Sequence, residues 1–249
     1  FEDRELHMKT AIVIGVGPIG GLGAQLCLRF AQLGMHVLVA GRTTDKLAKV
    51  VAVIEQEGGS AAAVQTDARN EEQVQALFDQ AGDQLEIAIF NVGNNTPGRV
   101  LEMDASFFEH SWRTCCYAGF LFGREAGRRF VKQNNTDAHP TLLFTGASAS
   151  LRGRANFGAF NASKGALRNL AQALAKEYAE IGVHVAHLII DGPINGEKIN
   201  TLLPEYAAKL GEQGMISLKG IVDAYEYLYQ QSPTAWSFEL DLRTSKESW

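Results

Sequence analysis

The densest run of residues that could do chemistry is a glycine loop near the start of the chain. Residues 15–23 read GVGPIGGLG, and Gly15, Gly17 and Gly20 match a GxGxxG spacing. Glycine lets the backbone approach a pyrophosphate closely, and the N–H groups that open a following helix face the anion. An apolar run precedes the loop and a helical pattern follows it. We therefore predict a dinucleotide-binding loop rather than a turn with only a packing role.

A second candidate contact follows the next apolar run, which ends Ala40-Gly41-Arg42. Proteins that bind NAD usually place an acidic residue here to hold the 2′-hydroxyl of the adenine ribose. No acid occupies this place. Gly41 leaves room, and Arg42 supplies a planar cation that suits a 2′-phosphate. The pattern favours NADP(H) over NAD(H), against the alternative that Arg42 is a solvated surface arginine.

The elements that must position these residues alternate between strands and helices, at about 30 residues per unit. Apolar, strand-like runs lie at residues 9–15, 36–40, 61–65, 86–91, 141–145, 183–190 and 238–242. Helical spacing of three and four begins at Leu22, at Leu47 and after a capping box of Asn70 and Gln73, and continues at 106–131, 161–181 and 221–229. We therefore predict an α/β fold of Rossmann type, a doubly wound parallel sheet with helices on both faces.

Composition excludes several classes of protein. The 249 residues carry 23 Lys and Arg against 28 Asp and Glu, a net charge of −5, and 46% are hydrophobic. A mildly acidic chain argues against nonspecific binding of nucleic acid, and it has no run of ~18 apolar residues that could span a membrane. Cys27, Cys115 and Cys116 are too few for a disulfide framework, which favours a cytoplasmic protein.

We expect residues 8–249 to form a single domain, because no Pro-rich or Ser-rich linker interrupts the alternation. Residues 1–7 are polar and precede Met8, so we interpret them as a cloning remnant outside the fold. No metal site is expected. His184 and His187 are three apart on a predicted strand and point to opposite faces, and no other cluster has ligand spacing.

In their order along the chain, these motifs resemble the short-chain dehydrogenase/reductase superfamily, over residues 9–242. The spacing Gly17-x-x-x-Gly21-x-Gly23 is similar to the glycine loop of the family, and the whole loop looks like a variant with two extra residues. Asn91-Val92-Gly93 after the fourth strand resembles the family's NAG motif. Residues 161–167, NASKGAL, resemble its SASKxAL helix.

The resemblance implies how a nicotinamide coenzyme would be held, in a crevice at the carboxyl ends of the strands. The glycine loop takes the pyrophosphate, Arg42 the 2′-phosphate and Asp67 the adenine. Asn91–Gly93 takes the region of the adenine-side ribose, and Lys164 takes the nicotinamide ribose. The complete coenzyme-binding set is Gly15, Gly17, Gly21, Leu22, Gly23, Arg42, Asp67, Ala68, Asn91, Val92, Gly93, Lys164 and Ile194.

The match is incomplete at the positions that exchange a proton with the substrate. In the family a Tyr lies four residues before the Lys; here the Lys is Lys164 and the Tyr position is Phe160. Enoyl reductases place the Tyr seven residues before the Lys, and that position is Phe157. No tyrosine lies between Tyr117 and Tyr178, so a shift in register does not restore the phenol.

Further family positions differ as well. The family's Ser position is Ala147, with Ser148 beside it, and the Asn of its long helix is Cys116. Its Pro-Gly after the sixth strand reads Asp191-Gly192. The features that would bind a coenzyme are therefore kept better than those that would carry out catalysis.

The predicted catalytic set is Lys164 and Ser148, with Phe160 where the family has its acid. A positioned general acid is worth about 10²–10⁴ in rate, so fast ketone reduction of the family type is not expected. Ser148, Tyr206, Tyr117 or an ordered water could supply the proton, or the substrate could be an activated C=C or an imine. The alternative function is a coenzyme-binding sensor or partner subunit without turnover.

Residues 194–214 occupy the place where the family builds its substrate lid. Three side chains there favour a small apolar or aromatic substrate: Leu202, Leu203 and Tyr206. Arg152 or Arg154, near the expected pocket mouth, would instead attract an anionic one. The family pairs its 161–181 helix across a two-fold axis, and the alanines of this helix allow close approach, so we expect a homodimer or homotetramer.

Overall fold

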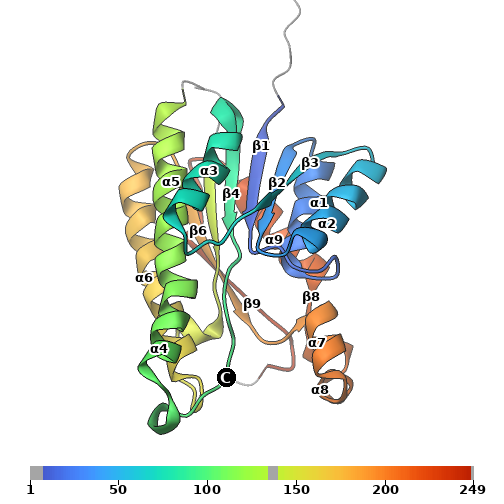
Figure 1. Cartoon of the computed structure of the whole chain (residues 1–249), viewed down its shortest axis with the longest axis vertical. Coiled ribbons are helices and arrows are strands. Elements are labelled where there is room, and N and C mark those ends of the chain that lie inside the picture. Colours follow the sequence, from blue (N-terminus) through green and yellow to red (C-terminus); the bar gives the residue numbers. More distant parts are fainter. Residues whose placement is uncertain (1–7, 134–139, 248–249) are drawn as a thin grey trace, which may run out of the picture.

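The computed structural model describes residues 8–133 and 140–247, so the predicted remnant at 1–7 lies outside the described residues. Its centre is one sheet of parallel strands in the order β3-β2-β1-β4-β5-β6-β9 (Figure 1). The strands are β1 (Thr10–Ile14), β2 (His36–Gly41), β3 (Ser60–Gln65), β4 (Leu85–Phe90), β5 (Thr141–Thr145), β6 (His184–Asp191) and β9 (Glu239–Arg243). The strand order reverses between β1 and β4, which confirms the predicted doubly wound sheet.

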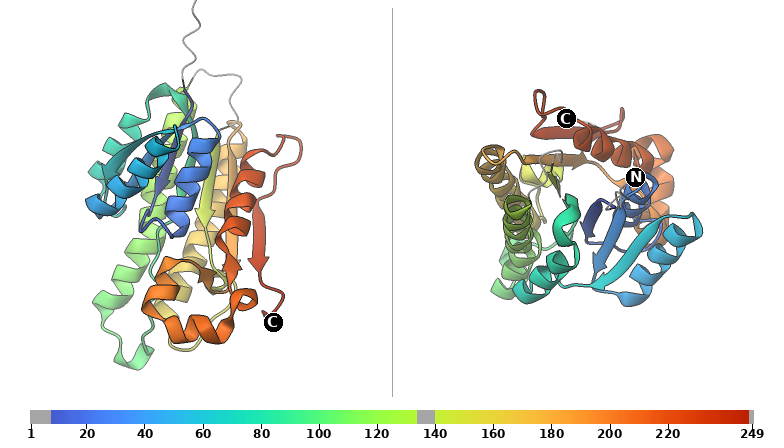
Figure 2. Two further views of the ribbon diagram at one scale, coloured as in Figure 1. Left: turned by 90° about the vertical axis from the view of Figure 1, so that its right-hand side faces the viewer. Right: turned by 90° about the horizontal axis from the view of Figure 1, so that it is seen from above.

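Helices cover both faces of this sheet, as the alternating pattern predicted. One face packs against α1 (Leu22–Gln32), α2 (Thr44–Gln56) and α9 (Leu218–Tyr229). The other face packs against α3 (Glu71–Gln80), α5 (Ala118–Lys132) and α6 (Gly158–Ala179). The view from above in Figure 2 shows α5 and α6 on the side of the sheet opposite α9.

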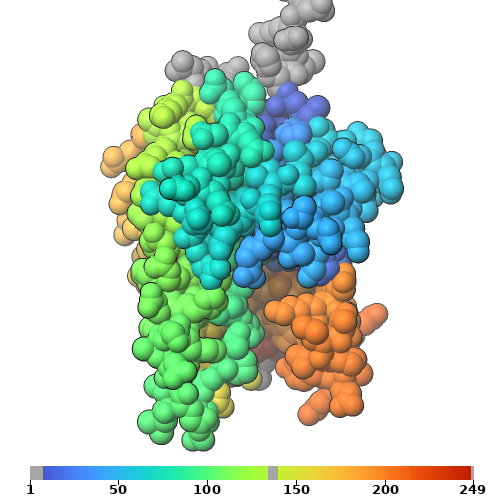
Figure 3. All heavy atoms as spheres, in the orientation of Figure 1, coloured from blue at the N-terminus to red at the C-terminus, as the bar shows by residue number. Residues whose placement is uncertain are grey.

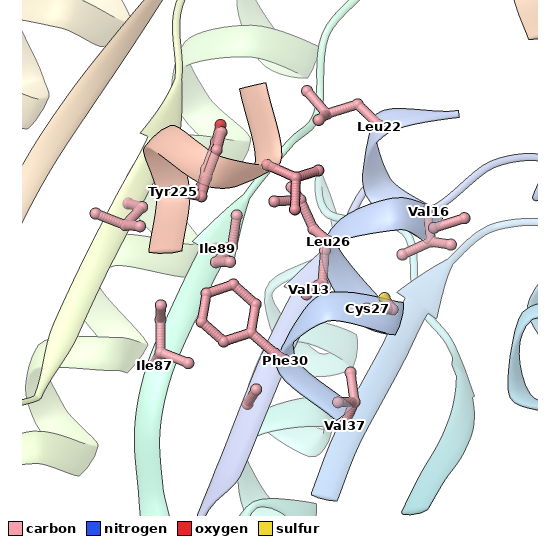
Figure 4. Close-up of a cluster of buried hydrophobic side chains, with 14 of the residues drawn as sticks. Val13, Val16, Leu22, Leu26, Cys27, Phe30, Val37, Ile87, Ile89 and Tyr225 are labelled. Atoms are coloured by element: carbon pink, nitrogen blue, oxygen red, sulfur yellow. The ribbon is translucent and has the colours of Figure 1, made fainter. Parts of the chain in front are cut away.

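Burial on both faces explains why the central strands read as continuous apolar runs. In β1, Ala11 and Val13 face the first layer of helices, and Ile12 and Ile14 face the second. Figure 4 shows the first layer, where the Phe30 ring of α1 lies among side chains of β1, β2 and β4.

The long helix predicted over 106–131 is present, but it is not uniform. It consists of α4 (Ala105–Trp112), a π-turn (Arg113–Tyr117) and α5. A π-turn adds one residue to a helical turn, so it rotates the side chains that follow it. The capping box before α3 forms only in part. Asn70 accepts a hydrogen bond from Gln73 N at 3.0 Å, but Gln73 Oε1 accepts from Asp67 N.

The stretch without a pattern, 191–214, contains elements that the sequence did not predict. The short helices α7 (Glu197–Leu202) and α8 (Pro204–Leu210) lie beside a two-stranded parallel pair, β7 (Ile194–Asn195) and β8 (Ile216–Ser217). Both helices are mostly exposed, so they lack the buried stripe that periodicity detects.

Membrane-spanning helices and metal-binding clusters are both absent from the described part of the chain. None of the helices placed there has both the length and the apolar content to cross a bilayer. The described residues also bring together no group of three or more His, Cys, Asp or Glu that could hold a metal ion.

Candidate active site

The predicted site residues follow the strands at one edge of the sheet. Gly15 follows β1, Arg42 follows β2 and Asn91 follows β4. Because all strands are parallel, their carboxyl ends meet at the same edge. Figure 3 shows a hollow at this end of the molecule, between α4 and the α7–α8 segment.

The glycine loop is shaped by one close contact. Gly15 has φ +90°, and a Cβ there would lie 2.3 Å from the backbone oxygen of Asn91, so only glycine fits. A Cβ at Gly17, in contrast, would meet nothing within 4 Å, which leaves the loop backbone open to a ligand. Helix α1 begins at Leu22 with no acidic residue in its first turn. Its first N–H groups have no partner within the helix, which suits a pyrophosphate.

A chain of hydrogen bonds fixes this loop from inside the protein. Asn91 Nδ2 donates to the carbonyl of Gly15 at 3.3 Å, and Thr145 Oγ1 donates to Asn91 Oδ1 at 2.9 Å. The Tyr225 hydroxyl contacts Thr145 Oγ1 and donates to it, because the Thr145 proton is already used. Burial raises the pKa of Tyr225, a fully buried side chain of α9 (Figure 4). Sequence reasoning missed Thr145 and Tyr225, since no local pattern links positions so far apart.

The adenosine end of the site carries two arginines. Arg69, which sequence reasoning missed, donates from Nε and Nη2 to the Asp67 carboxylate at 3.0 and 2.7 Å. These hydrogen bonds hold the pKa of Asp67 below its usual value. The predicted adenine contact is therefore already shared with Arg69, and the neighbouring Ala68 is buried. Arg42 is exposed and makes no ion pair within the described residues, which leaves its guanidinium available to a phosphate.

Lys164 lies at the centre of the site and is almost completely buried, with 4% of its surface exposed. Its Nζ donates to the carbonyl oxygens of Thr145 at 2.9 Å and Val92 at 3.5 Å. A Cβ at Gly93 would lie 3.1 Å from this nitrogen. The glycine therefore leaves Nζ accessible from that side. Burial lowers the pKa of Lys164. An ammonium has three N–H donors, and one remains for a ligand.

Of the two other predicted catalytic positions, Phe160 lies closest to this lysine in the contacts of the site, and Ser148 lies on the loop after β5. The Phe160 ring centroid is 6.0 Å from Lys164 Nζ, so the aromatic ring occupies the expected place but carries no proton. Ser148 opens a short 3₁₀ turn (Ser148–Ser150) and is half-buried. Asn161 Nδ2 donates to the carbonyls of Ala149 at 3.1 Å and Arg152 at 2.7 Å, which fixes the loop that carries Ser148.

Two adjacent cysteines of the π-turn differ in their burial. The family resemblance placed the Asn of the long helix at Cys116, which is half-buried. The buried residue beside Gly93 is Cys115, whose Sγ donates to Asn94 Oδ1 at 3.3 Å. Cys115 also interacts electrostatically with Lys164. Both cysteines lie in the π-turn, which the sequence pattern does not indicate.

The other predicted proton donors and cations have contacts of their own. The Tyr117 ring stacks on Trp112 at 5.9 Å, and Tyr206 lies in a lid cavity of about 720 Å³ that the segment 244–247 also lines. Arg152 Nη2 donates to the buried carboxylate of Asp191 at 2.9 Å, so its charge is compensated. Arg154 lies over the Phe157 ring, 4.9 Å from its centroid.

The lid segment contacts the glycine loop directly. The backbone N–H of Glu197 donates to the Gly20 carbonyl at 2.9 Å, and Gly20 N–H donates to Glu197 Oε2 at 3.1 Å. Ile194, at the base of the lid, pairs with Ile216 across β7 and β8. The three lid side chains predicted to favour an apolar substrate are exposed: Leu202, Leu203 and Tyr206.

Comparison with known proteins adds independent observations. Residues 9–201 match a family model described as short chain dehydrogenase. The uncharacterized oxidoreductase YuxG of Bacillus subtilis is 28% identical over 202 residues, which cover 79% of this chain but only 29% of YuxG. 3beta-Hydroxysteroid dehydrogenase 1 of Eggerthella lenta is 32% identical over 206 residues, 78% of this chain and 75% of that protein. A crystal structure of a short-chain dehydrogenase from Rhodopseudomonas palustris superimposes with a TM-score of 0.79 at 38% identity, covering 94% of this chain and 98% of that one.

Proposed function

Because this chain belongs to the short-chain dehydrogenase family of nicotinamide-dependent oxidoreductases, we propose that it uses NADP(H) and takes its proton from Lys164 rather than from residue 160. The observation that carries the proposal is the position of Lys164. It is a buried ammonium with a lowered pKa, held by two carbonyl oxygens, with one N–H to spare.

The residues at the sheet edge fit a dinucleotide. The open backbone at Gly17 and the N–H groups that begin α1 would hold the pyrophosphate. Arg42, which forms no ion pair with any residue that the structure describes, would hold a 2′-phosphate, and the exposed Gly93 would bring the nicotinamide ribose to Lys164. Asp67 and Ala68 would line the adenine, with the Asp67 carboxylate shared between the base and Arg69. The bound nicotinamide supplies or accepts the hydride.

Lys164 supplies the proton in this proposal. In the reductive direction, the substrate carbon gains the hydride and its oxygen or nitrogen gains a proton from Nζ, which leaves a neutral amine that solvent reprotonates. A lowered pKa favours this transfer, because proton donors act best when their pKa approaches the working pH. The Phe160 ring would lie against the amine and supply no proton. Ser148 would hold the substrate oxygen or nitrogen by a hydrogen bond.

The exposed lid side chains support a small apolar or aromatic substrate. Leu202 is 66% exposed and Leu203 is 55% exposed, so both have apolar surface left to cover. The Eggerthella lenta relative is named for a hydroxysteroid, an apolar alcohol. We further expect a cytoplasmic homodimer or homotetramer, whose mass light scattering would measure.

Lys164→Met and Phe160→Tyr, one helical turn apart on α6, test the proposed proton donor, and Lys176→Met is the control. NADPH oxidation is followed by absorbance over a panel of carbonyls, enones and imines. Lys164→Met should lower turnover by about 10²-fold or more, and the exposed Lys176→Met on the same helix should leave it unchanged. Phe160→Tyr should raise carbonyl reduction, because it restores a phenol beside Lys164.

The outcomes separate the proposal from its alternative. Full turnover in Lys164→Met would contradict Lys164 as the donor. Tight NADPH binding by the unmodified protein with no turnover on any substrate class would favour the alternative, a coenzyme-binding sensor or partner subunit. If Phe160→Tyr does not change the rate of carbonyl reduction, the geometry of substrate binding limits the reaction, and the missing phenolic acid does not.

A further inference from the structure

The contact between Glu197 and the glycine loop joins two parts of the chain by a reciprocal pair of hydrogen bonds. Gly20 N–H donates to the Glu197 carboxylate at 3.1 Å, and Glu197 N–H donates to the Gly20 carbonyl at 2.9 Å. Glu197 is the first residue of α7, so its carboxylate comes from the lid. The lid is therefore anchored on the loop by one of its own acidic side chains.

The Glu197 carboxylate brings negative charge to the N-terminus of α1, whose first turn has no acidic residue of its own. The N–H groups of this turn are oriented toward an anion. Gly20 immediately precedes the N-cap of that helix, Gly21. The charge of Glu197 therefore lies next to the site proposed for the coenzyme pyrophosphate, and it occupies a backbone donor of the same loop.

Glu197 itself has no compensating cation. It is exposed, and it forms no ion pair among residues 8–133 and 140–247. Like charges a few ångströms apart near a protein surface repel by an amount comparable to the free energy of a tenfold change in affinity. A bound diphosphate would experience this repulsion directly.

Building on the proposed function, we propose that Glu197 sets coenzyme affinity by charge. In the free protein its carboxylate holds the lid on the loop through Gly20 N–H. A coenzyme diphosphate competes with it electrostatically, so binding of the coenzyme releases the carboxylate from Gly20. Glu197 thereby weakens coenzyme binding and couples it to loosening of the lid anchor.

The charge is tested with Glu197→Gln, which keeps an oxygen that can accept from Gly20 N–H. Fluorescence titration with NADPH and NADH should give about tenfold tighter binding than in the unmodified protein at low salt. The difference should shrink in 1 M NaCl, where the Debye length falls to about 3 Å. The control is Glu205→Gln, an exposed acid of α8 in the same lid, which should bind the coenzyme as the unmodified protein does.

A second measurement does not depend on the coenzyme. Trypsin cleavage at Lys198, next to the anchor, should be faster in Glu197→Ala than in the unmodified protein. Glu197→Gln should be cleaved at nearly the unmodified rate. Saturating NADPH should increase cleavage of the unmodified protein, because the diphosphate displaces the carboxylate.

Unchanged or weaker coenzyme binding in Glu197→Gln at low salt would overturn the proposal. So would equal cleavage of Glu197→Ala and the unmodified protein. If no variant binds either coenzyme, the proposed function fails as well, and the cleavage rates without coenzyme still report whether Glu197 anchors the lid.

Discussion

The half of the molecule that carries the glycine loop differs in construction from the half that would hold the substrate. The loop is fixed by backbone contacts and by buried polar side chains, in a chain from Tyr225 to the Gly15 carbonyl. The lid consists of two short helices whose apolar side chains remain exposed, with Leu202 at 66%. The shape of the loop therefore depends on main-chain geometry and buried partners, whereas the lid exposes side chains that can change without disturbing the sheet.

The same difference separates two of the predicted catalytic positions, Lys164 and Phe160. Lys164 makes hydrogen bonds to two backbone carbonyls, so its place belongs to the rigid half. Phe160 is one helical turn earlier and faces the lysine only through its ring. We therefore expect Phe160→Tyr to alter none of the hydrogen bonds that hold Lys164 to the sheet.

The strongest test of the rigid half is Gly15→Ala, compared with Gly17→Ala. A Cβ at Gly15 would lie 2.3 Å from the Asn91 oxygen, at a φ of +90°. We expect a loss of about 3 kcal/mol in the free energy of unfolding and no coenzyme binding. Gly17→Ala, which has open space, should keep the stability of the unmodified protein in urea denaturation. Equal stability of the two variants would contradict the comparison.

A pH titration of stability examines the substrate half, where His187 is fully buried in β6 with Glu239 beside it at 3.0 Å. Burial lowers the pKa of His187 from 6.5 to about 4. Below pH 6.5 the unfolded chain therefore takes up a proton that the folded protein does not. Stability should fall by roughly 2 to 3 kcal/mol as the pH falls from 6.5 to 4.5.

The control for this titration is His187→Gln. Burial also lowers the pKa of His36 and His184, so they act over the same pH range in both proteins. The dependence of unfolding free energy on pH should flatten in His187→Gln by up to one proton. An identical slope would mean that His187 is protonated in the folded protein.

The smallest expected effect separates the two coenzymes. Arg42→Ala should weaken NADPH binding about tenfold or more, about 1.4 kcal/mol, because an Arg–phosphate pair is lost. NADH has no 2′-phosphate, so its binding should stay unchanged. Lys49→Ala, an exposed cation further along α2, serves as the control in the same titrations. Equal losses for both coenzymes would contradict the proposed preference for NADP(H).

The sequence predicted the sheet well because each central strand is marked by its own residues. The strand at 141–145 was predicted with the bounds it has, and β1 and β2 differ by about a residue at their ends. Short local motifs also singled out the glycine loop and Lys164, whose role in binding a coenzyme stays a prediction.

What the sequence did not predict depends on contacts between distant segments. Arg69 engages the Asp67 carboxylate, and Tyr225 reaches Thr145 from the far end of the chain. The π-turn at 113–117 contains both cysteines, and only Cys115 is fully buried there. Periodicity detects buried stripes, so it has no signal for such links or for the exposed helices α7 and α8.

The hydrogen bond from Tyr225 to Thr145 can form only after α9 has been synthesised. During synthesis the glycine loop emerges first, whereas α9, which supplies the phenol, and β9, which completes the sheet, emerge last. A nascent chain that ends before residue 218 has the loop but not the side chain that anchors it. We therefore expect a ligand of this loop to stabilise chains that include α9 more than chains that end before it.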